Sequence, residues 1–339
     1  MAEEGKDNGR RTREDAARTR SPGGLWPVGV RPVLHKELGD HLTGLRFGIL
    51  LLLVGVASLA SVYSSGQALR EVAFQAEGAR NVFLALFTAS GKQLPSFVSF
   101  LAFLGPLLGI ALGFDSLNSE RSQGTLSRLI SQPIHRDAVL DGKFLAGLAT
   151  IALMLIVLIL LVAGLGLIMV GVPPSLEEVL RLIIFVLVTV LYVGFWLALT
   201  QLFSVIFRQS STSALASIAV WLFFTIFAGL LVGLAADALA PLPSAPTMAE
   251  SVRHEEVLTS LDRLSPVTLY SESTTALLNP NVRSLGVLLP QQVERALASP
   301  LALEQSLLLV WPQIVGLIAG VVVFFAVGYV LFMREEVRA

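Results

Sequence analysis

Residues 114–144 carry a dense group of side chains capable of chemistry or binding, four of them basic and four acidic. This stretch lies between two long segments that contain no charge at all. Leu126, Leu129 and Ile130 would share a small apolar face of a helix, beside Arg121 and Arg128. This composition favours a contact surface for another protein.

Two residues shape this stretch. Gly124 permits a tight bend, and Pro133 ends any helix running through Ser131, because the residue before a proline avoids the α region. The sequence HRDAVLDGK that follows can begin the next helix. The expected result is a short amphipathic helix held below two rigid helices, which could transmit a push. The alternative interpretation is an ordinary solvated connector.

The sequence lacks the residues that several catalytic mechanisms require. The chain has no cysteine, which excludes a thiolate metal site and a cysteine nucleophile. His254 has Leu258 at the fourth position after it, so the paired histidines of a zinc protease are missing. SGKQL and DGKFL each contain a Gly-Lys pair, but neither has the earlier glycine or the following Ser or Thr of a phosphate-binding loop.

The segments around the charged stretch are strongly apolar. Only 14% of the chain is charged, against roughly 25% in an ordinary globular domain. About 20 apolar residues cross a hydrocarbon core of about 30 Å. Long segments without Asp, Glu, Lys, Arg or His therefore predict an all-α membrane protein with six transmembrane helices, at residues 47–69, 93–114, 144–176, 182–207, 209–236 and 305–333.

The absence of charge inside these segments bears on function. Ion-coupled transporters and proton pumps usually keep carboxylates or histidines inside the membrane. Serine, threonine and backbone groups could still hold sodium. The pattern favours a passage for apolar or amphipathic cargo, or one whose energy comes from elsewhere. The net charge of −1 gives no reason to expect a nucleic acid partner.

The distribution of basic residues predicts the orientation. Most of the 24 Lys and Arg residues fall in the segments that lie on the same side as both termini. Positive charge in short loops favours the cytoplasm. We therefore expect both termini and the loop 115–143 in the cytoplasm. The first apolar segment begins only at Phe47, behind a polar stretch, so a cleaved signal peptide is not expected.

Residues 31–46 predict an amphipathic helix before the first span. Leu34, Leu38, Leu42 and Leu45 fall on one helical face. The polar residues Lys36, Glu37, Asp40 and Thr43 lie elsewhere around this helix. Such a helix would lie on lipid at the inner membrane surface, and the alternative is a soluble extension of the first span. Residues 1–30 are expected to form a disordered cytoplasmic tail.

Two further segments lie between spans on the opposite side. The sequence NVFLALF, residues 81–87, is too short to span and would form a short interfacial helix or a buried loop. Residues 237–304 hold short amphipathic segments and several prolines. We expect them to form a helical external insertion that rests on the bundle as a cap, ahead of the last span and short tail at 305–339.

The charged loop resembles the first cytoplasmic loop of type-2 ABC transporter permeases, whose pattern is E-R-x-x-G-T-L-x-x-L-L-S-x-P-[VI]-x-R-x-x-[IV]-x-x-G-K. The matching residues are Glu120, Arg121, Gly124, Thr125, Leu126, Leu129, Ile130, Ser131, Pro133, Ile134, Arg136, Val139, Gly142 and Lys143. The helix before the first span is similar to the family's elbow helix through Lys36, Glu37, Asp40, Arg46 and Phe47. Permeases of copper-enzyme maturation systems are the most similar subgroup.

The resemblance implies one half of an exporter. Such permeases pair as dimers, either with a second copy or with a paired homologue, and a separate ATPase subunit docks under each. ATP and Mg²⁺ would then bind the partner subunit, and this chain would hold no cofactor or metal and would not be an enzyme. The rival interpretations are a non-transporting membrane scaffold or maturation factor, and a channel.

The resemblance also implies roles for residues. Leu126, Leu129 and Ile130 would form the surface gripped by the ATPase. Arg121, Arg128 and Arg136 would pair with its acidic groups, and Glu120 with a basic group of the ATPase or with the elbow helix. Gly124 and Pro133 would set the shape. The sequence departs from the family at His135 and in the length of residues 237–304, so the cargo of compact relatives does not transfer.

Overall fold

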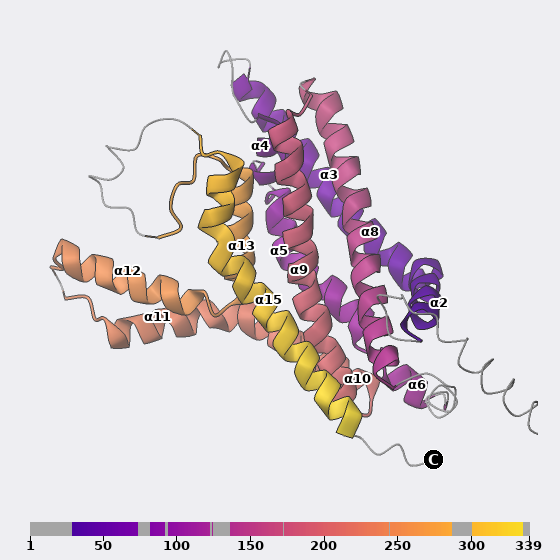
Figure 1. Cartoon of the computed structure of the whole chain (residues 1–339). Helices are drawn as coiled ribbons and strands as arrows, with labels where there is room; N and C mark the ends of the chain where they lie inside the picture. The colour runs from indigo at the N-terminus through magenta and orange to yellow at the C-terminus, as the bar shows by residue number, and fades with distance from the viewer. Residues whose placement is uncertain are drawn as a thin grey trace, which may run out of the picture.

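The computed structural model describes residues 29–73, 82–91, 94–122, 124, 136–171, 173–243, 245–286 and 300–334 (Figure 1). Every regular element in these ranges is helical. The elements are α2 (Val30–Thr43), α3 (Leu45–Ala73), α4 (Val82–Thr88), α5 (Phe97–Gly113), α6 (Asn118–Ser122), α8 (Arg136–Val170), α9 (Leu176–Ile206), α10 (Ser210–Leu222), the π-helix η1 (Phe223–Phe227), α11 (Ala228–Leu239), α12 (Met248–Asp262), α13 (Pro266–Leu278) and α15 (Leu303–Arg334).

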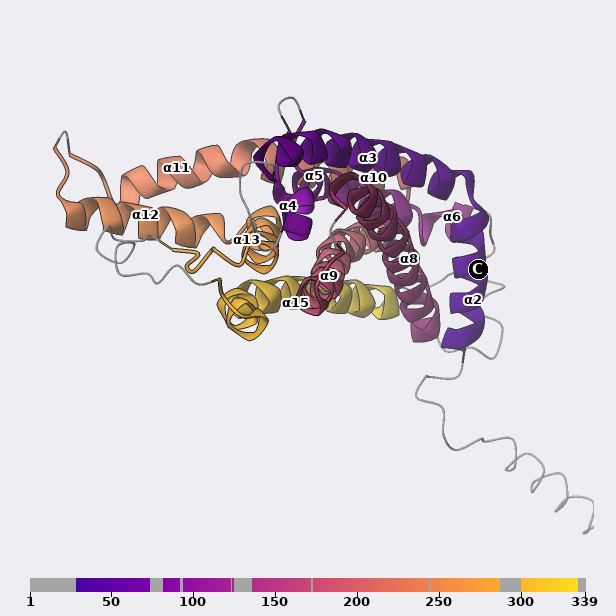
Figure 2. The ribbon, with the colours of Figure 1, turned by 90° about the horizontal axis from the view of Figure 1, so that it is seen from above.

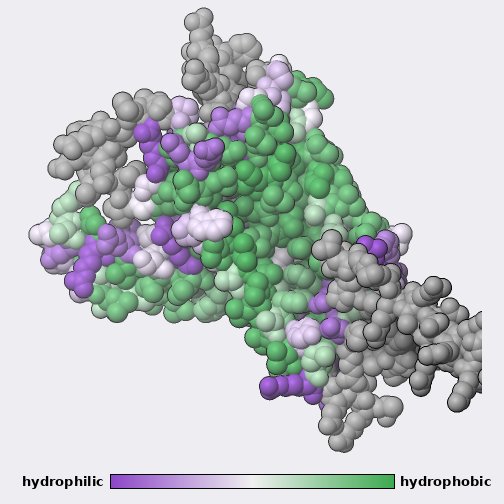
Figure 3. Space-filling view, viewed as in Figure 1, coloured by the Kyte–Doolittle hydropathy of each residue, from purple (hydrophilic) through white to green (hydrophobic). Residues whose placement is uncertain are grey.

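The six predicted spans are confirmed. Six helical segments are long and apolar enough to cross a membrane, at Leu45–Gln67, Phe97–Ser122, Asp137–Met169, Leu176–Ile206, Ser210–Leu239 and Leu303–Arg334. The protein is therefore an all-α membrane protein. Figure 3 shows hydrophobic residues over the middle of the bundle and hydrophilic residues gathered toward its ends and on the projecting helices.

The edges of the spans follow local capping rather than the ends of the apolar runs. The second span begins at Phe97 because Ser96 caps it, its hydroxyl accepting a hydrogen bond from the Ser99 amide. The fourth begins at Leu176 after a capping box between Ser175 and Glu178. The third extends back to Asp137 because RDAVLDGK continues into it without a break.

The two ends of the bundle, the loop end and the cap end, carry different elements. At the loop end, α2 meets α6 and the start of α8. At the cap end lie α4, the start of α9 and α13. Figure 2 shows α9 end-on in the centre, between α15 on one side and α5 and α8 on the other. It is the most buried of the six spans, so it forms the core of the bundle.

Helices α5 and α9 pack with their backbones in contact. Gly105, Gly109 and Gly113 lie four residues apart and face α9. A Cβ atom added at Gly109 would lie 2.7 Å from the Val193 carbonyl oxygen and 2.8 Å from the Leu197 amide nitrogen. Only glycine fits so close to another backbone, which is the usual reason for small residues between membrane helices.

The fifth span is bent, which the sequence pattern did not predict. The π-helix η1 lies between α10 and α11, and the Thr225 hydroxyl of η1 donates to the Trp221 carbonyl, 2.8 Å away. Inserted side chains and π-helices are common causes of helix bends. Beyond the bend, α11 and α12 pack together as a hairpin that projects from the bundle in both views (Figures 1 and 2).

Part of residues 237–304 packs into the bundle rather than only resting on it as a cap. Tyr270 of α13 is fully buried and stacks on Tyr192 of α9, with ring centroids 4.3 Å apart. The Tyr270 hydroxyl also lies 3.1 Å from the Thr189 hydroxyl of α9. These contacts insert α13 among α5, α9 and α15. Residues 244 and 287–299 of this segment lie outside the described ranges.

A buried arginine holds the cap end together. Arg181 of α9 is fully buried. Its guanidinium donates to the carbonyl oxygens of Leu277 and Leu301, at 2.8 and 2.7 Å, and to the Ser306 hydroxyl at 3.1 Å. Glu177, one turn away, neutralises its charge at 2.9 Å. Because a buried charge needs a partner and full hydrogen bonding, Arg181 fixes the end of α13 and the start of α15 against α9.

Candidate functional site

Helix α2, the elbow helix, lies across the bundle at the loop end. Figure 1 shows it nearly end-on and Figure 2 shows it lengthwise, whereas the spans run along the bundle. It ends at Gly44, where the backbone turns to an extended conformation before α3. A Cβ atom at Gly142 of α8 would lie 2.7 Å from the side chain of Val33, so α2 and α8 touch closely at this glycine.

The face of α2 that contacts the protein differs from the leucine face singled out in the sequence. Its buried residues are Val30, Val33 and Glu37. Leu34, Leu38 and Leu42 are half-buried beside this face, and Leu45 is exposed as the first residue of α3. The leucine face therefore lies to one side of the face that packs on α8, and its contact with a membrane surface stays a prediction.

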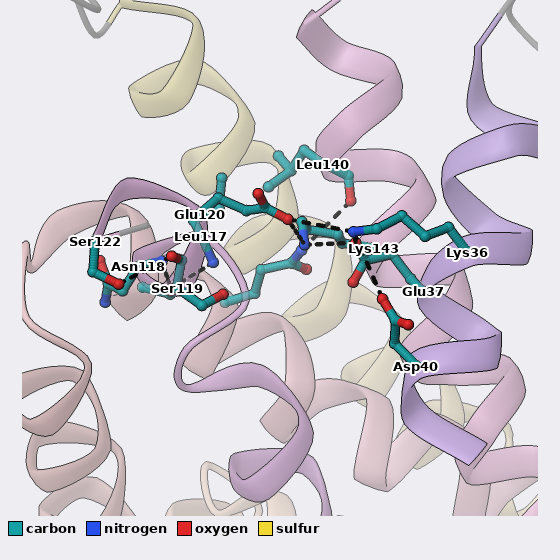
Figure 4. Close-up of polar contacts among 12 residues, drawn as sticks. Lys36, Glu37, Asp40, Leu117, Asn118, Ser119, Glu120, Ser122, Leu140 and Lys143 are labelled. Atoms are coloured by element: carbon teal, nitrogen blue, oxygen red, sulfur yellow. Dashed lines mark hydrogen bonds and ion pairs between the residues drawn. The ribbon is translucent and has the colours of Figure 1, made fainter. Parts of the chain in front are cut away.

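A buried ion cluster joins α2, α6 and α8 (Figure 4). The Lys143 ammonium of α8 lies 2.9 Å from a Glu37 carboxylate oxygen of α2 and 3.5 Å from a Glu120 oxygen of α6. Lys36 of α2 adds contacts to Glu37 at 3.2 Å, and to Glu120 and Asp40 at 3.6 Å each. The three central side chains are nearly buried, with 4% of Lys143 and 11% of each glutamate exposed.

The charges of the cluster depend on one another. Burial disfavours every charge in it, and only mutual pairing offsets that cost. Although burial opposes its charge, the carboxylates of Glu37, Glu120 and Asp40 raise the pKa of Lys36. Burial lowers the pKa of the neighbouring His41. The charge of Glu37 opposes this shift, and the charge of Lys143 adds to it. The cluster therefore favours the cationic form of Lys36 beside a histidine that is neutral near pH 7.

Helix α6 is also fastened to the end of α9. The Ser204 hydroxyl accepts hydrogen bonds from the Leu117 and Asn118 amides, at 3.1 and 3.3 Å, which satisfies two donors at the start of α6. The Arg121 guanidinium donates to the Val205 carbonyl at 3.3 Å. A cation is favourable there because the last carbonyls of a helix carry partial negative charge.

The first span is tied to the same end. The Arg46 guanidinium of α3 lies 2.6 Å from the Asp115 carboxylate, between α5 and α6. It also lies over the Phe114 ring, 5.1 Å from the centroid. The side chain of Gln201 in α9 donates to the Leu140 carbonyl of α8 at 3.4 Å. Both helices that flank residues 123–135 are thus bonded to their neighbours.

The structure describes only part of the predicted coupling surface. Glu120 contacts the elbow helix, one of its two predicted partners, while Arg121 bonds within the chain to α9. Gly124 has a φ of 65°, the left-handed conformation expected for a tight bend. Arg136 begins α8. The predicted residues outside the described ranges are Thr125, Leu126, Arg128, Leu129, Ile130, Ser131 and Pro133.

The sequence analysis missed Lys143 as the centre of the site. It entered only as the last residue of the resemblance, although its position carries a signal: it directly precedes the apolar segment that begins at residue 144. A lysine there must be paired or reach water. Ser204 gave no such signal, since it is one small polar residue within a span. In the described part of the chain, no group of three His, Asp or Glu residues could hold a metal ion.

The importance of the buried pair can be measured by a double-mutant cycle. We expect Glu37→Gln and Lys143→Met each to cost about 3–5 kcal/mol of unfolding free energy, because each leaves a buried charge without its partner. The double variant should cost less than the sum, with a coupling of about 1–3 kcal/mol. Reversible unfolding in mixed micelles gives these values.

The comparison pair is Lys36–Asp40 at the edge of the same cluster, where the side chains are 56% and 65% exposed and one helical turn apart, so it serves as the control for exposure. Its coupling should be below about 1 kcal/mol, as for other surface pairs. A Glu37–Lys143 coupling no larger than that of the control would contradict the role of the cluster.

Comparison with known proteins agrees with this architecture. Residues 31–337 match the family described as ABC-2 family transporter protein. A curated relative from Pseudomonas aeruginosa, named "Probable ABC transporter permease protein NosY", is 28% identical over 116 residues. That similarity covers 34% of this chain and 38% of the relative, so the chain matches well under half of the relative's length. The family match includes the elbow helix and all six spans, and the chain belongs to the ABC-2 transporter family.

Proposed function

We propose that this chain is the transmembrane permease subunit of an ATP-driven exporter for an apolar or amphipathic cargo. It lies in the cytoplasmic membrane with both termini in the cytoplasm. A separate ATPase subunit binds residues 123–136, where Leu126, Leu129 and Ile130 supply the apolar contact and Arg128 and Arg136 pair with acidic groups. The observation that carries the proposal is the buried cluster of Glu37, Lys143 and Glu120.

The cluster supports coupling because of where it lies. Residues 123–135 connect α6 to α8, and Lys143 of α8 contacts both Glu120 of α6 and Glu37 of α2. Ser204 fastens the start of α6 to α9. A force applied to residues 123–135 would therefore act on helices that are bonded to one another and to the core span α9.

The energy source and the partners follow from the chain and its family. The sequence has no phosphate-binding loop, so ATP and Mg²⁺ bind the partner subunit and this chain hydrolyses nothing. A second permease copy or a paired homologue completes the passage, as the family pairing suggests. The elbow helix rests on membrane lipid through its leucine face. The middle of each span carries no charge, which suits an apolar or amphipathic cargo better than an ion.

The ATPase contact is tested by Leu129→Asp. A charge placed on the apolar contact should remove the ATPase from the purified complex and abolish transport-linked ATP hydrolysis, because an unpaired charge in an interface is strongly unfavourable. The control is Leu264→Asp, which changes an exposed leucine of the external segment and should leave both unchanged. Normal co-purification and hydrolysis in Leu129→Asp would overturn the assignment of Leu129 to the ATPase contact.

The orientation is tested by single cysteines, because the chain has none of its own. Ser122 at the end of α6 and Ala245 before α12 are both exposed. In intact cells, a membrane-impermeant maleimide should label Ala245→Cys and should label Ser122→Cys only after the cells are opened. The reverse pattern would place residues 123–135 outside and end the proposal.

A further inference from the structure

A cavity of about 500 Å³ lies at the cap end, away from the ion cluster. It is formed by the end of α4, the first turns of α5, the bent segment η1 and α13. Its volume falls in the usual range for small-molecule sites, roughly 300–1,000 Å³. Bent π-helical segments such as η1 are frequent at functional sites.

One face of α13 supplies much of the lining. Val267, Ser271, Thr275 and Asn279 line the cavity and are spaced by four residues, so they share one side of this helix. Tyr270, on another face, packs against α9. Helix α13 therefore buries its aromatic side in the bundle and presents the hydroxyls of Ser271 and Thr275 to the cavity.

Three hydroxyls of the lining are free to bind a ligand. Those of Thr225 and Ser96 are engaged, with the Trp221 carbonyl and with α5 respectively. Within the described ranges, no hydrogen bond joins the hydroxyls of Ser90, Ser271 or Thr275 to another residue. A site built to bond hydroxyl or amide groups rejects molecules that leave its polar groups unpaired.

The lining also limits the ligand by charge. Of the described residues around the cavity, none is charged, so a charged headgroup would find no opposite charge among them. Phe103 adds an aromatic ring that is 48% exposed and packs edge-on against Trp221, with centroids 5.2 Å apart. Hydroxyls beside an accessible ring suit a molecule with polar edges and an apolar face.

We propose that this cavity binds the uncharged, hydroxyl-rich headgroup of an amphipathic molecule, such as a sugar headgroup. Its assignment as the recognition site for the cargo rests on the proposed exporter function, whereas the binding itself does not. The headgroup would bond Ser90, Ser271 and Thr275 and lie against Phe103. The cargo would then be an amphipathic molecule with an uncharged polar headgroup, a narrower class than the apolar or amphipathic cargo expected from the spans.

Binding is tested with the full chain alone in phosphatidylcholine nanodiscs, without the ATPase and without sugar detergents. Ser271→Cys introduces the only cysteine, and its reaction rate with a small thiosulfonate reports access to the cavity. Octyl glucoside below its micelle concentration should slow this reaction about tenfold at saturation. Octyl phosphocholine has the same tail with a charged headgroup and should not slow it.

Two comparison ligands separate recognition of the headgroup from recognition of the tail. Glucose, which has the headgroup without the tail, should protect the cysteine only at far higher concentration. Equal protection by glucose would overturn the amphiphile assignment. Equal protection by octyl phosphocholine, or none by octyl glucoside, would overturn the site.

A matched pair of neighbours then locates the binding. In the Ser271→Cys background, Thr275→Val removes a hydroxyl from the cavity, while Thr274→Val makes the same change on a buried residue bonded to the Tyr270 carbonyl. Thr275→Val should raise the half-protecting concentration about three- to tenfold, the effect of one hydrogen bond. Thr274→Val should leave it unchanged, and Ser90→Ala, which poses less risk to folding, should repeat the Thr275 result. Equal effects of the two threonine variants would contradict the proposal.

The cargo assignment has its own readout. In the complex with the ATPase, octyl glucoside should change the rate of ATP hydrolysis, and Thr275→Val should weaken that response. Protection of Ser271→Cys without any change in hydrolysis would keep the binding site and overturn its role in cargo recognition. Failure of the unsubstituted chain to purify with an ATPase would overturn the exporter function and would leave the binding result standing.

Discussion

The architecture of the loop end depends on one buried cation. Lys143 lies where a long apolar helix begins, and it is almost fully shielded from water. Its charge is tolerable only because Glu37 and Glu120 reach it from two other helices. Neither glutamate can move away without leaving a charge unpaired, so α2, α6 and α8 are held as one unit. This constraint gives the elbow helix and the connection at residues 123–135 a common support.

A second buried cation organises the opposite end. Arg181 ties α13 and α15 to the start of α9, while the end of α9 accepts the hydrogen bonds that seat α6. The core span therefore connects both clusters. Helix α5 makes a parallel link, since its first turns line the cavity and its last turn leads into α6. Because α5 and α9 meet at glycines with no room between their backbones, the loop end and the cavity are joined by closely packed helices.

The sequence predicts what depends on composition and misses what depends on contacts between distant residues. Six segments without charge predict the six spans, since apolar length alone decides them. Helix α13 escaped this test because its polar residues, among them Ser271, Glu272 and Thr275, make it too polar to resemble a buried helix. The bend at η1 gave no signal in an evenly apolar run. The partners of Lys143 lie 106 and 23 residues away, so only the folded chain brings them together, and the roles at residues 125–133 remain predictions.

The central claim is that α2 and α6 move as one unit when the ATPase acts. Distances between spin labels test this in the complex, with one labelled copy diluted among unlabelled chains. One pair of cysteines replaces the exposed residues His35 and Ser122, across the ion cluster. A second pair replaces Ser122 and Leu264, between the two ends of the bundle. On trapping the ATP-bound state, the first distance should stay constant while the second changes. A change in the His35–Ser122 distance as large as that between Ser122 and Leu264 would contradict the account.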